Sequence, residues 1–313
     1  MKTFVQVAEV WVPSADGRQL ELSAGLFDGA PAFGEISRAM RFARGEGLPG
    51  RAWDEGRPLL LRRLEGSYFR RAAAAQAAGL CCAVALPIFV DDKLTCVVLM
   101  LCGDAQAAVG AVELWHNDPR ITVDLKLADG YFSATDPELE ALTRDGSLSR
   151  GSGAPGMAWQ RESAVFIDSV GDSHKFLRAQ VAARAGIVRA LAIPCTALGR
   201  GTWILSLLSS SGAPIARRFE SWLSDAAGTH LQRAFGFCEV RGRLAVDIAS
   251  AQAPSALGPI GEAWRSGVAQ AATGNQALSA LGEGEAAAAG LSSLLAIPVI
   301  SDDAVTEVVA LYF

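Results

Sequence analysis

An internal repeat constrains this chain more than any other feature, because a repeated segment predicts a repeated structural unit. Three glycine-rich segments each lead into a tryptophan, followed by an alanine-rich stretch, a glycine and, eight residues later, a proline in an apolar run. The tryptophans (Trp53, Trp159 and Trp264) lie 106 and 105 residues apart, and the prolines (Pro87, Pro194 and Pro298) lie 107 and 104 apart. The sequence therefore predicts three tandem copies of one module.

Within each copy the pattern predicts strand, strand, short helix, glycine loop, strand, helix, strand, strand. Residues 121–127 alternate between apolar and polar side chains, which is typical of an antiparallel strand with one wet face. Short helices are expected at 35–42 and 136–142, and Asp91-Asp92 and Asp302-Asp303 are expected to form hairpin turns. The predicted fold class is α+β, with each module a central antiparallel sheet flanked by helices.

The predicted domains are module 1 at 1–104, module 2 at 105–212, a connecting helix at 213–235 and a truncated module 3 at 236–313. Phe219, Trp222 and Leu223 recur at helical spacing. Glu239, taken as the counterpart of Glu9 and Glu113, precedes its tryptophan by 25 residues instead of 44 and 46, which suggests a loss of about 20 residues. The short connector after residue 103 predicts that the first two sheets pair or pack tightly.

Charge and apolar patterning limit the function classes. The 313 residues carry a formal net charge of −5 with a pI of about 5.4, which argues against binding to phosphate backbones. Apolar runs such as 81–90 are shorter than the roughly 20 residues of a membrane span, and the N-terminus lacks the apolar core of a signal peptide. We expect a cytoplasmic protein that contacts neither nucleic acid nor membrane, with its six cysteines as buried thiols.

The repeated motif resembles that of the GAF domain family. It reads Gly-x-Gly-Leu-Pro-Gly-x-x-Trp from Gly45 to Trp53, then Phe-x-Arg-Ala from Phe69, then Ala-Gly-Leu and a strand containing proline. The match is good over 44–102, moderate over 150–208 and partial over 257–313. The resemblance implies a sheet of five or six strands and a pocket between the sheet and the segment that follows the glycine motif. Family members are mostly regulatory and bind cyclic nucleotides, bilins, haem, metabolites or proteins, whereas a few reduce free methionine sulfoxide.

The glycine motif also has the letters of a dinucleotide-binding loop, at 45–50 and again at 151–156. Such a loop needs a strand before it and a helix after it. Here a helix-like stretch precedes the first motif, and proline fills its fifth position in both copies. We favour a structural role, in which the glycines supply positive φ angles and close backbone approach.

No cofactor signature is found, so the cofactor stays open. Cys81-Cys82 lacks the histidine that follows the anchoring cysteine of the family's bilin binders, and the pair has no counterpart in the other copies. Packed strand thiols are the preferred interpretation, with a redox-active pair as the alternative. His116, His174 and His230 lack the spacing of metal or haem ligands, and the signature of the cyclic-nucleotide members is absent.

The remaining candidates for ligand binding lie where the family's pocket wall is expected. Arg71 and Arg178 each follow an aromatic residue, and their guanidinium groups could clamp an anion. The alternative is an ion pair with an acid such as Asp54 or Asp172. Copy three has Gly282 at this position and should not bind the same ligand. The candidate set comprises Trp53, Phe69, Arg71, Cys81, Trp159, Phe176 and Arg178, although the tryptophans are more typical of a core.

These observations predict a non-enzymatic regulatory protein of signal transduction. Its modules would bind a small molecule, with module 1 as the first candidate, or a separate protein partner that carries the output activity. A homodimer is compatible with either kind of binding. The second hypothesis is an interaction scaffold without any ligand. The third is a reductase of the free methionine sulfoxide type that uses Cys81 and Cys82.

Overall fold

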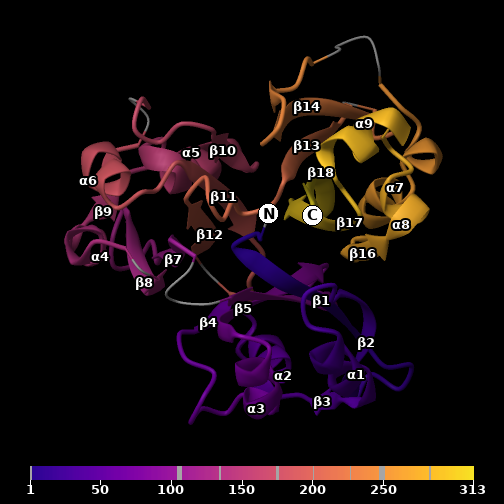
Figure 1. Ribbon diagram of the computed structural model, residues 1–313. Coiled ribbons are helices and arrows are strands. Elements are labelled where there is room, and N and C mark those ends of the chain that lie inside the picture. Colours follow the sequence, from indigo (N-terminus) through magenta and orange to yellow (C-terminus); the bar gives the residue numbers. More distant parts are fainter. Residues whose placement is uncertain are drawn as a thin grey trace.

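The computed structural model describes residues 2–103, 108–133, 135–173, 176–199, 201–225, 227–246, 251–281 and 283–313. These residues form three six-stranded antiparallel sheets, one after another along the chain (Figure 1). The sheets share one strand order, β3-β2-β1-β6-β5-β4 in the first and its equivalents in the other two. The α+β class and the three repeated modules are confirmed.

The elements fall into three sets of the same order. Module 1 contains β1 (Val5–Pro13), β2 (Gln19–Leu26), α1 (Pro31–Ala39), β3 (Arg41–Ala43), α2 (Gly47–Glu55), β4 (Leu59–Leu61), α3 (Ala72–Ala77), β5 (Leu80–Val90) and β6 (Lys93–Gly103). Module 2 contains β7 (Gly110–Asn117), β8 (Leu125–Ser133), α4 (Pro137–Asp145), β9 (Ser147–Leu148), α5 (Gly153–Arg161), β10 (Val165–Ile167), α6 (Ala179–Arg184), β11 (Arg189–Cys195) and β12 (Thr202–Ser209). Module 3 contains β13 (Arg218–Ser224), β14 (Leu231–Cys238), β15 (Gly242–Arg243), η1 (Pro254–Leu257), α7 (Pro259–Ser266), β16 (Gln270–Thr273), α8 (Gly274–Ala277), α9 (Glu283–Ala289), β17 (Ser293–Ser301) and β18 (Ala304–Tyr312).

The predicted connecting helix at 213–235 is wrong, because β13 and the start of β14 occupy this segment. Phe219 packs into a core shared by all three modules, whereas Trp222 packs into the core of module 3 itself. A strand with both faces buried lacks the alternation of apolar and polar residues that marks a half-exposed strand. The apolar residues of β13 therefore occur at a spacing that is also typical of a helix.

Module 3 is consequently not truncated, which corrects the second domain prediction. Its first strand is β13, and Trp222 precedes Trp264 by 42 residues, as Trp11 precedes Trp53. The counterpart of Glu9 is therefore Glu220 and not Glu239. The predicted boundary between modules 1 and 2, at 104/105, lies outside the described residues.

The glycine motif opens a helix that lies close to the preceding strand. Gly45 and Gly47 have φ angles of +80° and +59°, and α2 begins at Gly47. A Cβ on Gly50 would lie 2.1 Å from the carbonyl oxygen of Ala43 in β3. The structural role of the glycines is confirmed, although a short strand, and not a helix, immediately precedes them.

Hairpin turns form where the paired aspartates predicted them. Asp91 and Asp92 have φ angles of +49° and +58°, and Asp302 and Asp303 have +49° and +59°. Two successive residues in the left-handed region match the twist of a two-residue hairpin, and aspartate tolerates that region better than most residues. These turns join the longest strand pairs of modules 1 and 3, β5–β6 and β17–β18.

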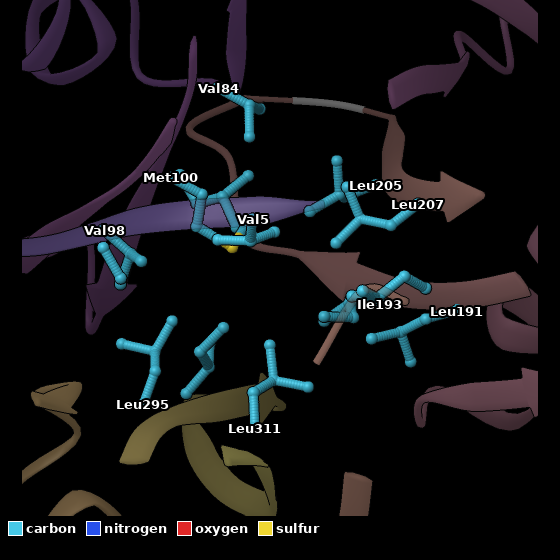
Figure 2. Close-up of a cluster of buried hydrophobic side chains, with 14 of the residues drawn as sticks. Val5, Val84, Val98, Met100, Leu191, Ile193, Leu205, Leu207, Leu295 and Leu311 are labelled. Atoms are coloured by element: carbon cyan, nitrogen blue, oxygen red, sulfur yellow. The ribbon is translucent and has the colours of Figure 1, made fainter. Parts of the chain in front are cut away.

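One core joins the three modules. Each sheet turns one face to its own helices and the other to the centre of the molecule, where Val98 and Met100 of β6 meet Leu191 and Ile193 of β11 and Leu311 of β18 (Figure 2). Alternate residues of β6, such as Val97 and Leu99, face the helices of module 1 instead. The first two sheets thus pack tightly, as predicted, but without strand pairing between them.

The modules also contact one another in a ring, through equivalent positions. The N–H of Ala164 in module 2 donates to Oε2 of Glu307 in module 3 at 2.6 Å, and the N–H of Ala269 in module 3 donates to Sγ of Cys96 in module 1 at 3.3 Å. The third equivalent position is Pro58, which has no N–H. The residue equivalent to Glu307 and Cys96 in module 2 is Trp203, which has no acceptor atom to offer.

Candidate functional site

A glutamate and a tryptophan two residues apart lie on the first strand of every module, and their side chains point into the module interior. The indole Nε1 donates to a carboxylate oxygen of the glutamate at 2.8–2.9 Å in each pair. All six side chains are buried. The pairs are Glu9–Trp11 in β1, Glu113–Trp115 in β7 and Glu220–Trp222 in β13.

In module 1 this glutamate binds the predicted ligand-binding arginine. Arg71, just before α3, donates to both carboxylate oxygens of Glu9, at 2.5 and 2.9 Å, and to Ser37 Oγ of α1 at 2.5 Å. The Arg71 and Glu9 side chains are 1% and 0% exposed. The carbon at the centre of the guanidinium lies 4.7 Å from the centre of the Phe33 ring and 5.1 Å from that of Phe69.

Module 2 repeats this arrangement. Arg178 donates to the two oxygens of Glu113 at 2.7 and 3.1 Å, and it also donates to the hydroxyl of Thr143 in α4, the equivalent of Ser37. Its guanidinium carbon lies 5.2 Å from the ring of the buried Phe176. A bidentate pair with a hydroxyl as a third partner uses most of the donors that an arginine has.

Module 3 forms a similar ion pair, but its arginine comes from a strand. Arg218 lies in β13, two residues before Glu220, and donates to Glu220 Oε1 at 2.5 Å and to Glu285 of α9 at 2.7 Å. Arg233 of β14 adds a further bond to Glu220 at 3.0 Å. Gly282, which stands in module 3 at the position of Arg71 and Arg178, lies outside the described residues. The interior cation is thus present in all three modules although its origin in the sequence differs.

The predicted alternative partners of the two arginines are wrong. Asp54 pairs with Arg44 on the surface at 2.9 Å, and Asp172 accepts a hydrogen bond from Ser169. Because the glutamates lie 62 and 65 residues before the arginines in the chain, their pairing is not visible in local spacing. The signal that could have found them is the Glu-x-Trp sequence, which occurs at the start of all three copies.

The two candidate tryptophans lie beside these interiors, not within them. Trp53 of α2 and Trp159 of α5 are half-buried and pack against the cores of their own modules. Their rings lie 6.0 and 5.7 Å from the guanidinium carbons of Arg44 and Arg150, respectively. Burial against the module core agrees with the structural interpretation of these residues.

The cysteine pair lies away from both interiors, at the junction of modules 1 and 2. Cys81 is half-buried with its Sγ 3.0 Å from the hydroxyl of Tyr131 in β8. Cys82 is fully buried in the shared core opposite Cys102, and burial together with the neighbouring thiols holds its pKa well above the usual range. Since the thiolate is the reactive form of cysteine, this environment disfavours nucleophilic chemistry at Cys82.

The histidines are separate from one another. His116 stacks on Trp203 with ring centres 4.2 Å apart, and burial lowers its pKa. His230 lies beside Asp225 in the turn between β13 and β14, and His174 lies outside the described residues. Across the described residues, no group of three or more histidine, cysteine, aspartate or glutamate side chains could hold a metal ion.

An open cleft of about 340 Å³ separates module 1 from module 3. One wall is the start of β1, the end of β2 and the residues that follow it, and the other is formed by module 3 residues near the end of β18. The residues that line it include Lys2, Gln6, Asp28, Arg217, Ser292 and Phe313. Sequence reasoning missed this cleft, because it forms between two modules and leaves no motif in either.

No family model matches the sequence, and no curated protein matches it. Among solved structures, the A. aeolicus nlh2 GAF domain in an inactive state aligns at 17% identity over 32% of this chain and 58% of that chain, with a TM-score of 0.26. The GAF domain of a phosphoenolpyruvate-protein phosphotransferase from Coxiella burnetii aligns at 14% over 32% and 58%, with a TM-score of 0.27.

A free methionine-R-sulfoxide reductase from Neisseria meningitidis, solved with its substrate, aligns at 17% identity over 34% of this chain and 53% of that chain, with a TM-score of 0.25. The chain therefore spans a little over half the length of each of these three proteins. The repeated sheet order shows that this chain consists of three modules of one α+β fold. The glycine motif of modules 1 and 2 resembles that of GAF domains.

In the part of the chain that the structure describes, no helix has both the length and the apolar character needed to cross a membrane.

Proposed function

We propose that this chain is a non-enzymatic regulatory protein of signal transduction, whose three GAF-like modules form one scaffold for a separate protein partner. The observation that carries the proposal is the closed interior of modules 1 and 2. There, Arg71 and Arg178 are bound by the chain's own glutamates where the family resemblance places a ligand pocket. A ligand in that position would have to break a buried, bidentate ion pair, which costs several kcal/mol.

The surroundings of the cysteines count against the reductase hypothesis. Burial disfavours the thiolate at Cys82, and burial likewise raises the pKa of Cys96 to about 12. The hydroxyl of Tyr131, next to Cys81, is itself held protonated by burial, which raises its pKa. None of these groups supplies the nearby positive charge that lowers the pKa of a catalytic cysteine.

Two measurements test the proposal. Native mass spectrometry with an absorbance spectrum, on the chain purified from its own host, should show the mass of the chain alone or of its complex with a protein. Reconstitution of that complex from the two purified proteins should then give a fixed stoichiometry. The proposal is overturned if no protein copurifies with the chain, or if a crystal structure of the chain from its host shows a molecule of a few hundred daltons bound between Glu9 and Arg71 or between Glu113 and Arg178.

A further inference from the structure

The loop between β7 and β8 exposes two large apolar side chains to solvent. Apolar and polar residues alternate over 121–127, but β8 begins only at Leu125, so the first two apolar residues of this pattern lie in the loop. Ile121 and Val123 are 81% and 83% exposed, more than any other large apolar residue in the described part of the chain, whereas Leu125 is fully buried. Since apolar stabilisation is proportional to the area removed from water, Ile121 and Val123 contribute little to the stability of the fold.

The other two modules make the same connection without large apolar residues. The equivalent loops are residues 14–18 between β1 and β2 and residues 225–230 between β13 and β14. Alanine is the largest apolar residue in either of them. The fold can therefore close this loop with small and polar residues, and Ile121 and Val123 are particular to module 2.

Hydrogen bonds within the loop hold its backbone in place. The carbonyl of Asp118 accepts from the N–H of Ile121 at 2.9 Å and from that of Thr122 at 3.0 Å. The side-chain amide of Asn117, a buried residue of β7, donates to the carbonyls of Thr122 at 2.7 Å and Asp124 at 3.0 Å. A loop that is ordered before it binds loses less conformational entropy on binding.

The charges of the loop leave one carboxylate uncompensated. The guanidinium of Arg120 donates to both carboxylate oxygens of Asp118, at 2.6 and 2.9 Å, and neutralises them. Asp124, the residue after the apolar pair, is half-buried and has no ion-pair partner among the described residues. Lys126 instead donates to the carbonyl of Gly146 at 3.5 Å. A surface that covers the apolar pair must therefore accept a negative charge at its edge, which a lysine or arginine there would do.

Size and charge both argue against a second copy of the chain as the occupant. The two side chains bury roughly 200 Å² between them, whereas a stable interface needs about 800 Å² from each protein. A symmetric dimer through this loop would also bring the two Asp124 carboxylates together. A concave apolar pocket, in contrast, surrounds both side chains and makes them the anchor of a larger interface.

We propose that the loop at 118–124 is the anchor through which the chain binds its protein partner, and that the partner receives it in an apolar pocket with a basic residue at the edge. Ile121 and Val123 enter the pocket, and the Asp124 carboxylate faces the basic residue. The proposal rests on the scaffold function, because it requires a separate protein partner, and it names the surface and the chemistry of the contact.

Titration of the partner against variants of the full chain tests this anchor. The protein that copurifies with the unmodified chain from its host is identified by mass spectrometry, produced separately and titrated by calorimetry. Ile121→Ser and Val123→Ser should each weaken binding about tenfold, because each removes a branched apolar side chain from the pocket. Asp124→Asn should weaken binding about threefold at low salt and less at high salt, since salt screens the lost charge interaction.

Val240→Ser is the matched control, because Val240 lies between β14 and β15 in module 3 and is 68% exposed. It should leave the affinity unchanged. All four variants should also keep the thermal unfolding midpoint of the unmodified chain, because none of the changed side chains is fully buried. An unchanged midpoint separates a lost contact from a lost fold.

The possible failures are distinguishable. If the complex forms but Ile121→Ser and Val123→Ser bind the partner as tightly as the unmodified chain does, or Val240→Ser weakens binding equally, the anchor is overturned and the scaffold function stands. If no protein copurifies with the unmodified chain, both are overturned. If the unmodified chain sediments as a dimer and Ile121→Ser as a monomer, a second copy covers the loop, and the proposed partner pocket is overturned.

Discussion

At the scale of single residues, the buried glutamate of the first strand forms an ion pair with an arginine in every module. Modules 1 and 2 use an arginine directly before their third helix, α3 or α6, and module 3 uses one from its first strand. The positions equivalent to Arg218 in the other modules are Val7 and Ala111. In all three modules a guanidinium group thus lies beside the glutamate, but in module 3 the arginine belongs to a different element.

Loss of Glu9 should therefore destabilise the protein strongly. Glu9→Gln leaves the Arg71 guanidinium buried with no carboxylate, and breaking a buried pair in this way costs about 3–5 kcal/mol. Urea unfolding would measure the loss. Asp54→Asn is the matched control, since it breaks an exposed pair with Arg44 and should cost less than about 1 kcal/mol. Equal effects of the two substitutions would contradict the structural role of the interior pair.

The burial of Glu307 predicts how the stability of the folded chain changes with pH. Its carboxylate is fully buried, accepts from Ala164 N–H and Ser221 Oγ, and has its pKa raised by burial. A folded-state pKa above the unfolded value means that this group favours folding at low pH and that its contribution is lost as pH rises through the folded-state pKa. Glu307→Gln should therefore unfold at higher urea concentration than the unmodified chain at pH 8, and this advantage should shrink toward pH 4.

A control variant shows whether the charge of the Glu307 carboxylate causes this pH dependence of stability. Glu162→Gln, which alters an exposed carboxylate bonded to Ser301, is the control and should not change the pH dependence. A Glu307→Gln variant that is less stable than the unmodified chain at pH 8 would show that the charge strengthens the interface between modules 2 and 3.

At the scale of elements, the sequence predicted those structures whose cause is local. The paired aspartates formed hairpin turns, and the glycines of the repeated motif adopted positive φ angles. β13 was misassigned because both of its faces are buried, one in the shared core and one in module 3. The Glu9–Arg71 contact and the inter-module cleft depend on segments far apart in the chain, so no spacing rule could place them.

The close approach of α2 to β3 gives an element-scale prediction. Gly50→Ala would place a methyl group 2.1 Å from the backbone oxygen of Ala43, and neither backbone can move without disturbing the helix or the strand. A loss of about 1–3 kcal/mol or more is expected. Gly29→Ala is the control, since a Cβ there meets no atom within 4 Å. Comparable unfolding midpoints for the two variants would argue against this packing.

At the scale of the whole molecule, the three modules depend on one another. Each contributes a sheet face to the shared core, and hydrogen bonds at equivalent positions join module 2 to module 3 and module 3 to module 1. A fragment of residues 2–103 would expose Cys96, Val98 and Met100, which are fully buried in the intact chain. We expect this fragment to aggregate or to lack cooperative unfolding, as judged by gel filtration and circular dichroism, and a stable monomeric fragment would contradict a shared core.

Scanning calorimetry of the full chain tests the single shared core most directly. One core predicts one unfolding transition, with a calorimetric enthalpy of roughly 200 kcal/mol near 60 °C and a van't Hoff enthalpy equal to it. Modules that fold independently would instead give two or three transitions, or a van't Hoff enthalpy near one third of the calorimetric value. The first result would establish the chain as one cooperative unit, and the second would show that the modules are joined only by their connectors.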